Sequence, residues 1–115
     1  MRMKTKLLFL CSENADRTAC AEAIFQNSDK YKAKSATLPP FKENLVTGQA
    51  LAWADIIFII DEEDEKQKKI LLEVFPEVSR KKIITLNISK EFSRYDKELY
   101  RLMREALEKS GINLN

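Results

Sequence analysis

Histidine is absent from this chain of 115 residues, and cysteine and glycine each occur only twice. Without histidine, a Cys–His catalytic pair is excluded, so a reactive cysteine must be activated by other groups. The two cysteines occur in no secretory context, which argues against a disulfide scaffold. This cysteine usage is typical of a reducing compartment, and we therefore expect a cytoplasmic protein with a reactive or buried thiol.

Long apolar runs and an excess of charge of one sign are also lacking. The longest strongly apolar runs, 7–10 and 56–60, are far too short to span a bilayer. The net charge is only +2, and charges of both signs are interspersed along the chain. These features give no argument for a nucleic acid or a membrane as partner. The length fits one domain, residues 1–115, that is large enough to bury a core.

Strand-like and helix-like patterns alternate along the chain. Short apolar runs predict strands, and apolar positions at helical spacing predict helices. The predicted strands are 6–10, 31–37, 56–60 and 82–88, and the predicted helices are 18–26, 47–54, 63–75 and 96–109. Thr47 and Ser93 are candidate N-terminal caps. Pro76 and Gly111 should end the third and fourth helices.

Such alternation predicts a single three-layer α/β domain, with a four-stranded parallel sheet and helices on both faces. Ligands of such sheets bind beyond the carboxyl ends of the strands. Cys11 directly follows the first predicted strand, and the loop 89–95 follows the last one. Both should therefore open on the same edge of the sheet, which is where we expect the functional site.

The segment from Cys11 to Arg17 has the pattern of a phosphate-binding loop with a sulfur nucleophile at its base. Backbone N–H groups of a short polar loop and the positive end of the following helix can bind an anion. These groups and Arg17 also favour the thiolate, which is the nucleophilic form of cysteine. The planar guanidinium of Arg17 can bind two phosphoryl oxygens. Arginine is electrostatically unfavourable at a helix N-terminus, and this placement favours an anion-binding role.

Four segments resemble the low-molecular-weight protein tyrosine phosphatases. The run 7–25, with its Cys-x5-Arg-Thr pattern, resembles the first strand, phosphatase loop and first helix of that family. The segment 35–37 resembles the end of its second strand. Residues 46–47, followed by 53–58, resemble its second helix and third strand. The segment 95–99, with the short loop before it, looks most like a compact subgroup of predicted tyrosine phosphatases. The resemblance covers nearly the whole chain.

This resemblance implies a two-step hydrolysis. The Cys11 thiolate attacks phosphorus to form a phosphocysteine, which water then hydrolyses. Arg17 and the loop amides hold the oxygens on which charge accumulates in the transition state. The implied substrate is a phosphotyrosine-containing protein or a small aryl phosphate, with inorganic phosphate as product, and neither a metal nor another cofactor is required. The implied substrate-binding residues are Ser12, Glu13, Asn14, Ala15, Asp16 and Thr18.

The resemblance also implies supporting roles. Thr18 corresponds to a residue whose hydroxyl bonds the cysteine sulfur in the family. Asn14 corresponds to an asparagine that holds the loop in a left-handed conformation, and Ser35 corresponds to a serine bonded to that asparagine. Cys20 is interpreted as a core thiol of the first helix.

Two loop residues depart from the family pattern. Glu13 stands where the family usually has glycine, and Asp16 stands where it often has a second cysteine. A carboxylate of Asp16 pointing inward at ~6 Å from the phosphate would oppose binding by about 3 kcal/mol at an effective dielectric of ~20. Pointing outward it would cost little and could pair with Lys or Arg of a binding partner. We expect the outward orientation.

The general acid that protonates the leaving group has two candidates. The family uses an Asp-Pro pair in the loop after the last strand, and this pair is missing here. Glu91 fits the loop position with a longer side chain. Asp96 has the expected carboxyl group but stands at the start of the last predicted helix. Both remain candidates for the acid that later activates water.

Two alternative functions remain. A catalytically weak or inactive pseudophosphatase that binds phosphate or a phosphopeptide is consistent with Glu13, Asp16 and the missing Asp-Pro pair. An arsenate reductase shares the loop but relays electrons through cysteines further along the chain. Because no cysteine follows Cys20, that alternative is less favoured. A cysteine that closes a buried strand can also be a simple core residue, and Arg17 argues against this interpretation.

Overall fold

Strands and helices alternate along the computed structural model, which describes residues 3–11, 16–39, 43–61, 66–89 and 91–114. The strands are β1 (Thr5–Cys11), β2 (Tyr31–Thr37), β3 (Ile56–Asp61) and β4 (Lys82–Asn87), and the helices are α1 (Asp16–Ile24), α2 (Gly48–Trp53), α3 (Lys66–Val74) and α4 (Lys97–Lys109). A short 3-10 helix, η1 (Pro76–Arg80), lies between α3 and β4. The predicted order of strands and helices is confirmed.

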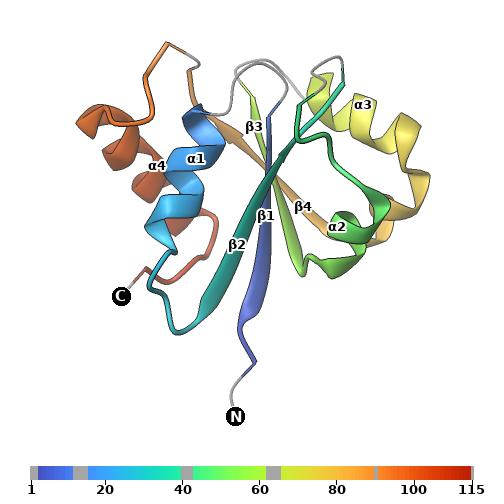
Figure 1. Ribbon diagram of the computed structural model, residues 1–115, viewed down its shortest axis with the longest axis horizontal. Helices are drawn as coiled ribbons and strands as arrows, with labels where there is room; N and C mark the ends of the chain where they lie inside the picture. Colours follow the sequence, from blue (N-terminus) through green and yellow to red (C-terminus); the bar gives the residue numbers. More distant parts are fainter. Residues whose placement is uncertain (1–2, 12–15, 40–42, 62–65, 90, 115) are drawn as a thin grey trace.

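The four strands form one parallel sheet in the order β2-β1-β3-β4. The register pairs Cys11 with Thr37 of β2, and it pairs Leu10 with Ile59 of β3. Because all strands run in the same direction, their carboxyl ends meet at one edge of the sheet (Figure 1). The end of β1 and the end of β4 therefore open on the same edge, as predicted.

Alternate residues of β1 face opposite sides of the sheet, as strand geometry requires. Leu7 and Phe9 belong to a core cluster that includes buried residues of α1 and α4. Leu8 and Leu10 belong to a second cluster with residues of α2 and α3. Helices α1 and α4 accordingly cover one face and α2 and α3 the other (Figure 1). The predicted three-layer arrangement is confirmed, and β1 is apolar throughout because both of its faces are covered.

Two of the predicted helix ends are confirmed by their hydrogen bonds. The Thr47 hydroxyl accepts from the backbone N–H of Ala50 at 3.1 Å and caps α2. Gly111 follows α4 with φ of 93°, a conformation that glycine adopts without strain. Its N–H donates to the Glu108 carbonyl, and the next N–H along the chain donates to the Leu107 carbonyl. This pair of bonds is a Schellman motif that closes the helix.

Other boundaries differ from the predictions. Helix α1 begins at Asp16 instead of residue 18, which places Arg17 inside its first turn. The cap of α4 is Asp96 and not Ser93, because the Asp96 carboxylate accepts from the N–H of Glu98 at 2.8 Å. Pro76 begins η1, since proline fits the first turn of a helix, where its missing N–H is not needed. Residues 63–65 of the predicted third helix lie outside the described residues.

None of the helices in the described part of the chain combines the length and the apolar character that a membrane crossing requires.

Candidate functional site

Cys11 is the last residue of β1, and its side chain is fully buried. Its carbonyl accepts the N–H of Leu38 at 3.1 Å, so backbone hydrogen bonds to the β2 side hold it in place. The next residue that the structure describes is Asp16, which begins α1. The sulfur therefore lies between the end of a central strand and the first turn of a helix, as the sequence predicts.

The side chain of Arg17 connects three elements at this edge. It is only 1% exposed. Its Nη2 donates to Cys11 Sγ at 2.9 Å, and its Nη1 donates to the carbonyl of Ile88, just beyond β4, at 2.7 Å. Arg17 thus joins the first turn of α1 to the ends of β1 and β4. This geometry places a fixed positive charge directly against the sulfur atom.

One donor of Arg17 is not used by the described part of the chain. Its Nε is buried and has no hydrogen-bond partner there. A buried donor without a partner costs about 1–3 kcal/mol, and more when the group is charged. The arrangement is therefore suited to an anion that accepts from this guanidinium.

Asp16 forms an ion pair that the sequence did not predict. Its Oδ1 accepts from Arg94 Nε at 2.9 Å. Arg94 lies in the segment between β4 and α4, which runs beside the start of α1 in Figure 1. The sequence left Asp16 open to pairing with a basic residue of a binding partner, and the structure shows that an arginine of the same chain pairs with it. No local pattern links two residues 78 positions apart, and only the sheet topology brings them together.

The supporting residues lie on both sides of β1. Thr18 is buried in the first turn of α1. Ser35 lies on β2, two residues before the partner of Cys11, and its hydroxyl donates to Glu22 Oε2 at 2.6 Å. The predicted contact of Ser35 with Asn14 lies outside the described residues, as do Ser12, Glu13, Asn14 and Ala15 themselves.

Thr37 is a structural residue of the site that the sequence reasoning missed. It is buried opposite Cys11, and its hydroxyl donates to the carbonyl of Glu43 at 2.5 Å. Its backbone N–H donates to the carbonyl of Asn44 at 2.8 Å. Thr37 therefore anchors the segment after β2 at the same edge as Cys11. A buried threonine at the end of an edge strand has no distinctive sequence signal.

The two candidate acids occupy different settings. Glu91 is exposed, and its backbone N–H donates to Ser89 Oγ at 3.3 Å. It follows Ile88 by three residues, so the Cα atoms of the two lie within about 10 Å of each other. Glu91 also lines a groove of about 480 Å³ with Ile88, Ser89 and residues of α4. The structure therefore places Glu91 on the segment that Arg17 contacts.

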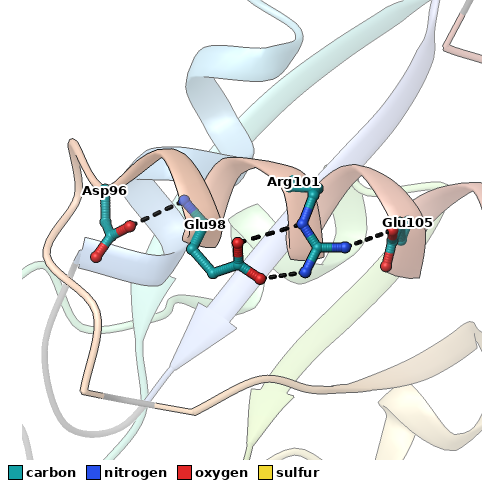
Figure 2. A network of polar contacts seen from close by, with 4 residues as sticks. All are labelled: Asp96, Glu98, Arg101 and Glu105. Carbon is teal, nitrogen blue, oxygen red and sulfur yellow. Dashed lines mark hydrogen bonds and ion pairs between the residues drawn. The ribbon is translucent and has the colours of Figure 1, made fainter.

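Asp96 is instead part of the surface of α4. Its carboxylate caps the helix at the N–H of Glu98 (Figure 2). Further along the same surface, Arg101 forms ion pairs with Glu98 and Glu105. These contacts hold the pKa of Glu98 below its ordinary value, with the hydrogen bond from Arg101 as the main cause. Asp96 thus has a capping role, and donation of its proton would compete with that role.

Cys20 lies on α1 within the core cluster that contains Phe9 and Met103. Burial raises the pKa of its thiol. This side chain is therefore an uncharged packing group at neutral pH, in agreement with its interpretation as a core thiol.

Taken together, the fold and the site define a class of protein: a three-layer α/β domain with a cysteine–arginine pair at the carboxyl edge of its parallel sheet. Comparison with solved structures identifies the fold as that of the low molecular weight protein tyrosine phosphatases. One such structure, the low molecular weight protein tyrosine phosphatase SP-PTP from Streptococcus pyogenes, matches with a TM-score of 0.71 at 18% identity. The match covers 94% of this chain and 91% of the other.

A second structure with this fold is the YwlE arginine phosphatase from Geobacillus stearothermophilus. It matches with a TM-score of 0.63 at 18% identity and covers 93% of each chain. No family model matches the sequence, and no curated protein does so either. The likeness therefore lies in the fold.

Proposed function

We propose that this protein is a cysteine-dependent phosphatase, a hydrolase of phosphotyrosine or of another aryl phosphate. The observation that carries the proposal is the contact of Arg17 Nη2 with Cys11 Sγ at the carboxyl edge of the sheet. A nucleophilic sulfur and a guanidinium at hydrogen-bond distance are the two groups that phosphoryl transfer to cysteine needs. The phosphatase names of the two structural neighbours support the same assignment.

Binding of the phosphoryl group rests on positive charge and N–H donors. In the proposed complex, Arg17 turns donors toward the phosphoryl oxygens, and its unpartnered Nε is one of them. The N-terminal end of α1 adds to the anion site. We assign the remaining donors to the amides of residues 12–15, which lie outside the described residues. Thr18, in the first turn of α1, supports the sulfur, and Ser35 supports the loop.

The first chemical step transfers the phosphoryl group to sulfur. The Cys11 thiolate attacks phosphorus, the S–P bond forms, and the bond from phosphorus to the leaving oxygen breaks. The leaving phenolate takes a proton from a carboxylic acid. The charge on the equatorial oxygens is stabilised by Arg17 and the amides, so the step uses neither a metal nor another cofactor.

The second step restores the enzyme. The carboxylate formed in the first step takes a proton from water, and the oxygen of that water attacks phosphorus. The S–P bond breaks, inorganic phosphate leaves, and the thiolate is regenerated. We assign the acid to Glu91, because Asp96 is engaged in capping α4. A cytoplasmic location fits a catalytic thiol that must stay reduced.

Hydrolysis of p-nitrophenyl phosphate in reducing buffer tests the proposal, measured from mildly acidic to neutral pH. Wild type should turn over, Cys11→Ser should not, and the matched variant Cys20→Ser should retain the wild-type rate. Binding of inorganic phosphate by Cys11→Ser would show that the site is still formed. Phosphate binding without turnover in wild type would refute the enzyme and favour a pseudophosphatase.

The substrate class needs a separate comparison. A phosphotyrosine peptide should be hydrolysed faster than a phosphoserine peptide, because the proposed substrate carries an aryl leaving group. Phosphoarginine belongs in the same panel, since one of the structural neighbours is an arginine phosphatase. Faster hydrolysis of phosphoarginine than of phosphotyrosine would move the proposal to that substrate.

A further inference from the structure

The ion pair between Asp16 and Arg94 lies beside the proposed anion site. Asp16 immediately precedes Arg17, the residue that contacts the sulfur. Its Oδ1 lies 2.9 Å from Arg94 Nε, and the two side chains are 31% and 44% exposed. This carboxylate, next in sequence to Arg17, is thus held by an arginine from the segment between β4 and α4.

Two arginines connect α1 with the segment after β4, one from each side. Arg17 reaches from α1 to the carbonyl of Ile88, at the end of β4. Arg94 reaches back from the segment after β4 to Asp16 in the first turn of α1. Both Ile88 and Arg94 therefore contact α1, and Glu91 lies between these two residues in the sequence.

The charges at this position raise a specific problem. A site that binds a phosphate dianion is weakened by a carboxylate next to its main cation, and at partial exposure this repulsion is only partly screened. Arg94 supplies one positive charge at hydrogen-bond distance from that carboxylate. The pair as a whole is neutral, whereas Asp16 alone is not.

We infer that Arg94 is a positioning residue of the phosphate site, which neutralises Asp16 and holds its carboxylate away from the bound anion. This inference rests on the proposed function, because it assumes that phosphate binds at Cys11 and Arg17. It assigns to Arg94 a role that acts through Asp16 and involves no contact with the reacting atoms. It also accounts for an acidic residue in the first turn of α1, beside the proposed anion site.

Charge compensation can be distinguished from simple fastening of the segment, because the pair can be broken from either side. Arg94→Gln removes the positive charge of the pair and keeps the negative charge of Asp16. Asp16→Asn breaks the same ion pair but removes the negative charge. If the pair only fastens the segment, both variants should lose phosphate affinity equally. If Arg94 compensates the charge of Asp16, only Arg94→Gln should lose phosphate affinity.

The experiment measures the dissociation constant of inorganic phosphate by titration calorimetry on the full chain. We expect Arg94→Gln to weaken phosphate binding about tenfold at low salt, as the loss of one nearby positive charge would. Asp16→Asn should bind phosphate more tightly than wild type, because it removes a negative charge beside the site while Arg94 keeps its positive charge. The double variant removes both charges and should bind within about twofold of wild type, so that Asp16→Asn rescues the loss caused by Arg94→Gln. The loss in Arg94→Gln should shrink as salt is raised.

Two further variants serve as controls. Arg94→Lys keeps the charge and should restore most of the binding that Arg94→Gln loses. Arg101→Gln makes the same change of net charge at an arginine paired with Glu98 and Glu105 of its own helix (Figure 2), and it should leave phosphate binding unchanged.

The outcomes separate the inference from the proposed function. Wild-type affinity in Arg94→Gln, or equal losses in Arg94→Gln and Asp16→Asn, would overturn the inference while the phosphate site stands. Failure of wild type to bind phosphate would overturn the proposed function and this inference with it. Because the ion pair is exposed, all variants should keep melting temperatures close to wild type.

Discussion

Arg17 donates to Cys11 Sγ at 2.9 Å, and the same guanidinium donates to the carbonyl of Ile88 at 2.7 Å. This residue is six positions from the cysteine and 71 from Ile88, yet it joins both in a buried setting. One side chain therefore links the proposed nucleophile to the segment that carries Glu91. The relationship makes the chemistry of the site depend on the shape of arginine as well as on its charge.

Replacing Arg17 by lysine tests that dependence on shape. Lysine keeps the positive charge, but a single ammonium cannot reproduce a planar group that meets the sulfur and a carbonyl together. We expect kcat/KM for p-nitrophenyl phosphate to fall by at least about 100-fold, with weaker inhibition by inorganic phosphate. Steady-state kinetics measures this, and circular dichroism controls for folding. Turnover within a few-fold of wild type would mean that charge alone is sufficient.

Glu91→Gln tests the assignment of the general acid. Glutamine has nearly the same shape as glutamate but cannot donate the proton. We expect kcat for a phosphotyrosine peptide to fall about 100-fold, while the affinity for inorganic phosphate stays close to wild type. The acid should matter less for p-nitrophenyl phosphate, whose leaving group is stable without a proton, than for a phosphotyrosine peptide. An equal, small effect on both substrates would exclude Glu91 as the acid.

Two substitutions separate the capping role of Asp96 from a role as general acid. Asparagine is as good an N-cap as aspartate but cannot serve as an acid, whereas alanine removes both functions. We expect Asp96→Asn to keep stability and turnover. Asp96→Ala should lose about 1 kcal/mol of unfolding free energy and keep most of its turnover. Urea denaturation and peptide kinetics give the two readouts. A large loss of kcat in Asp96→Asn would move the acid to Asp96.

Cys20 makes stability depend on pH in a defined direction. Burial raises the pKa of its thiol, so in the folded protein the thiol stays protonated to higher pH than in the unfolded chain. The stabilisation from Cys20 is therefore complete below the unfolded pKa of about 8.5, and it is lost as pH rises through the folded pKa.

We expect Cys20→Ala to unfold more easily than wild type near neutral pH, by roughly 1 kcal/mol. The difference between the two proteins should narrow toward pH 10 or so, because the unfolded wild-type chain then gains the ionised thiolate. Urea denaturation at both pH values measures the change. A difference that stays constant would contradict burial as the cause, and a loss of turnover in Cys20→Ala would contradict its role as a packing group.

The parts of the fold that depend on neighbouring residues could be predicted from the sequence. The apolar run of β1 is visible because both faces of the strand are covered, and the ends at Thr47 and Gly111 follow from local hydrogen bonding. The cap at Asp96 was misplaced at Ser93, since both residues are good caps and only the backbone geometry distinguishes them. Helix η1 was missed because proline was interpreted only as a stop.

The candidate site could be predicted only in part. Cys11 and Arg17 lie close together in the sequence with a recognisable spacing, and the structure brings them into contact. The contacts with Ile88 and Arg94 cross more than 70 positions, and they depend on β4 and α1 ending at the same edge of the sheet. Such pairs leave no local pattern, so the sequence could not indicate that Asp16 pairs with an arginine of its own chain.

The central claim is that Cys11 carries the phosphoryl group, and mass spectrometry of the protein quenched in acid during turnover of p-nitrophenyl phosphate tests it most directly. The account predicts a peptide that contains Cys11 and is heavier by one phosphoryl group, in wild type and in Cys20→Ser. Cys11→Ser should show neither the modification nor turnover. A phosphoryl group found on another residue, or p-nitrophenol released by Cys11→Ser at the wild-type rate, would contradict the claim.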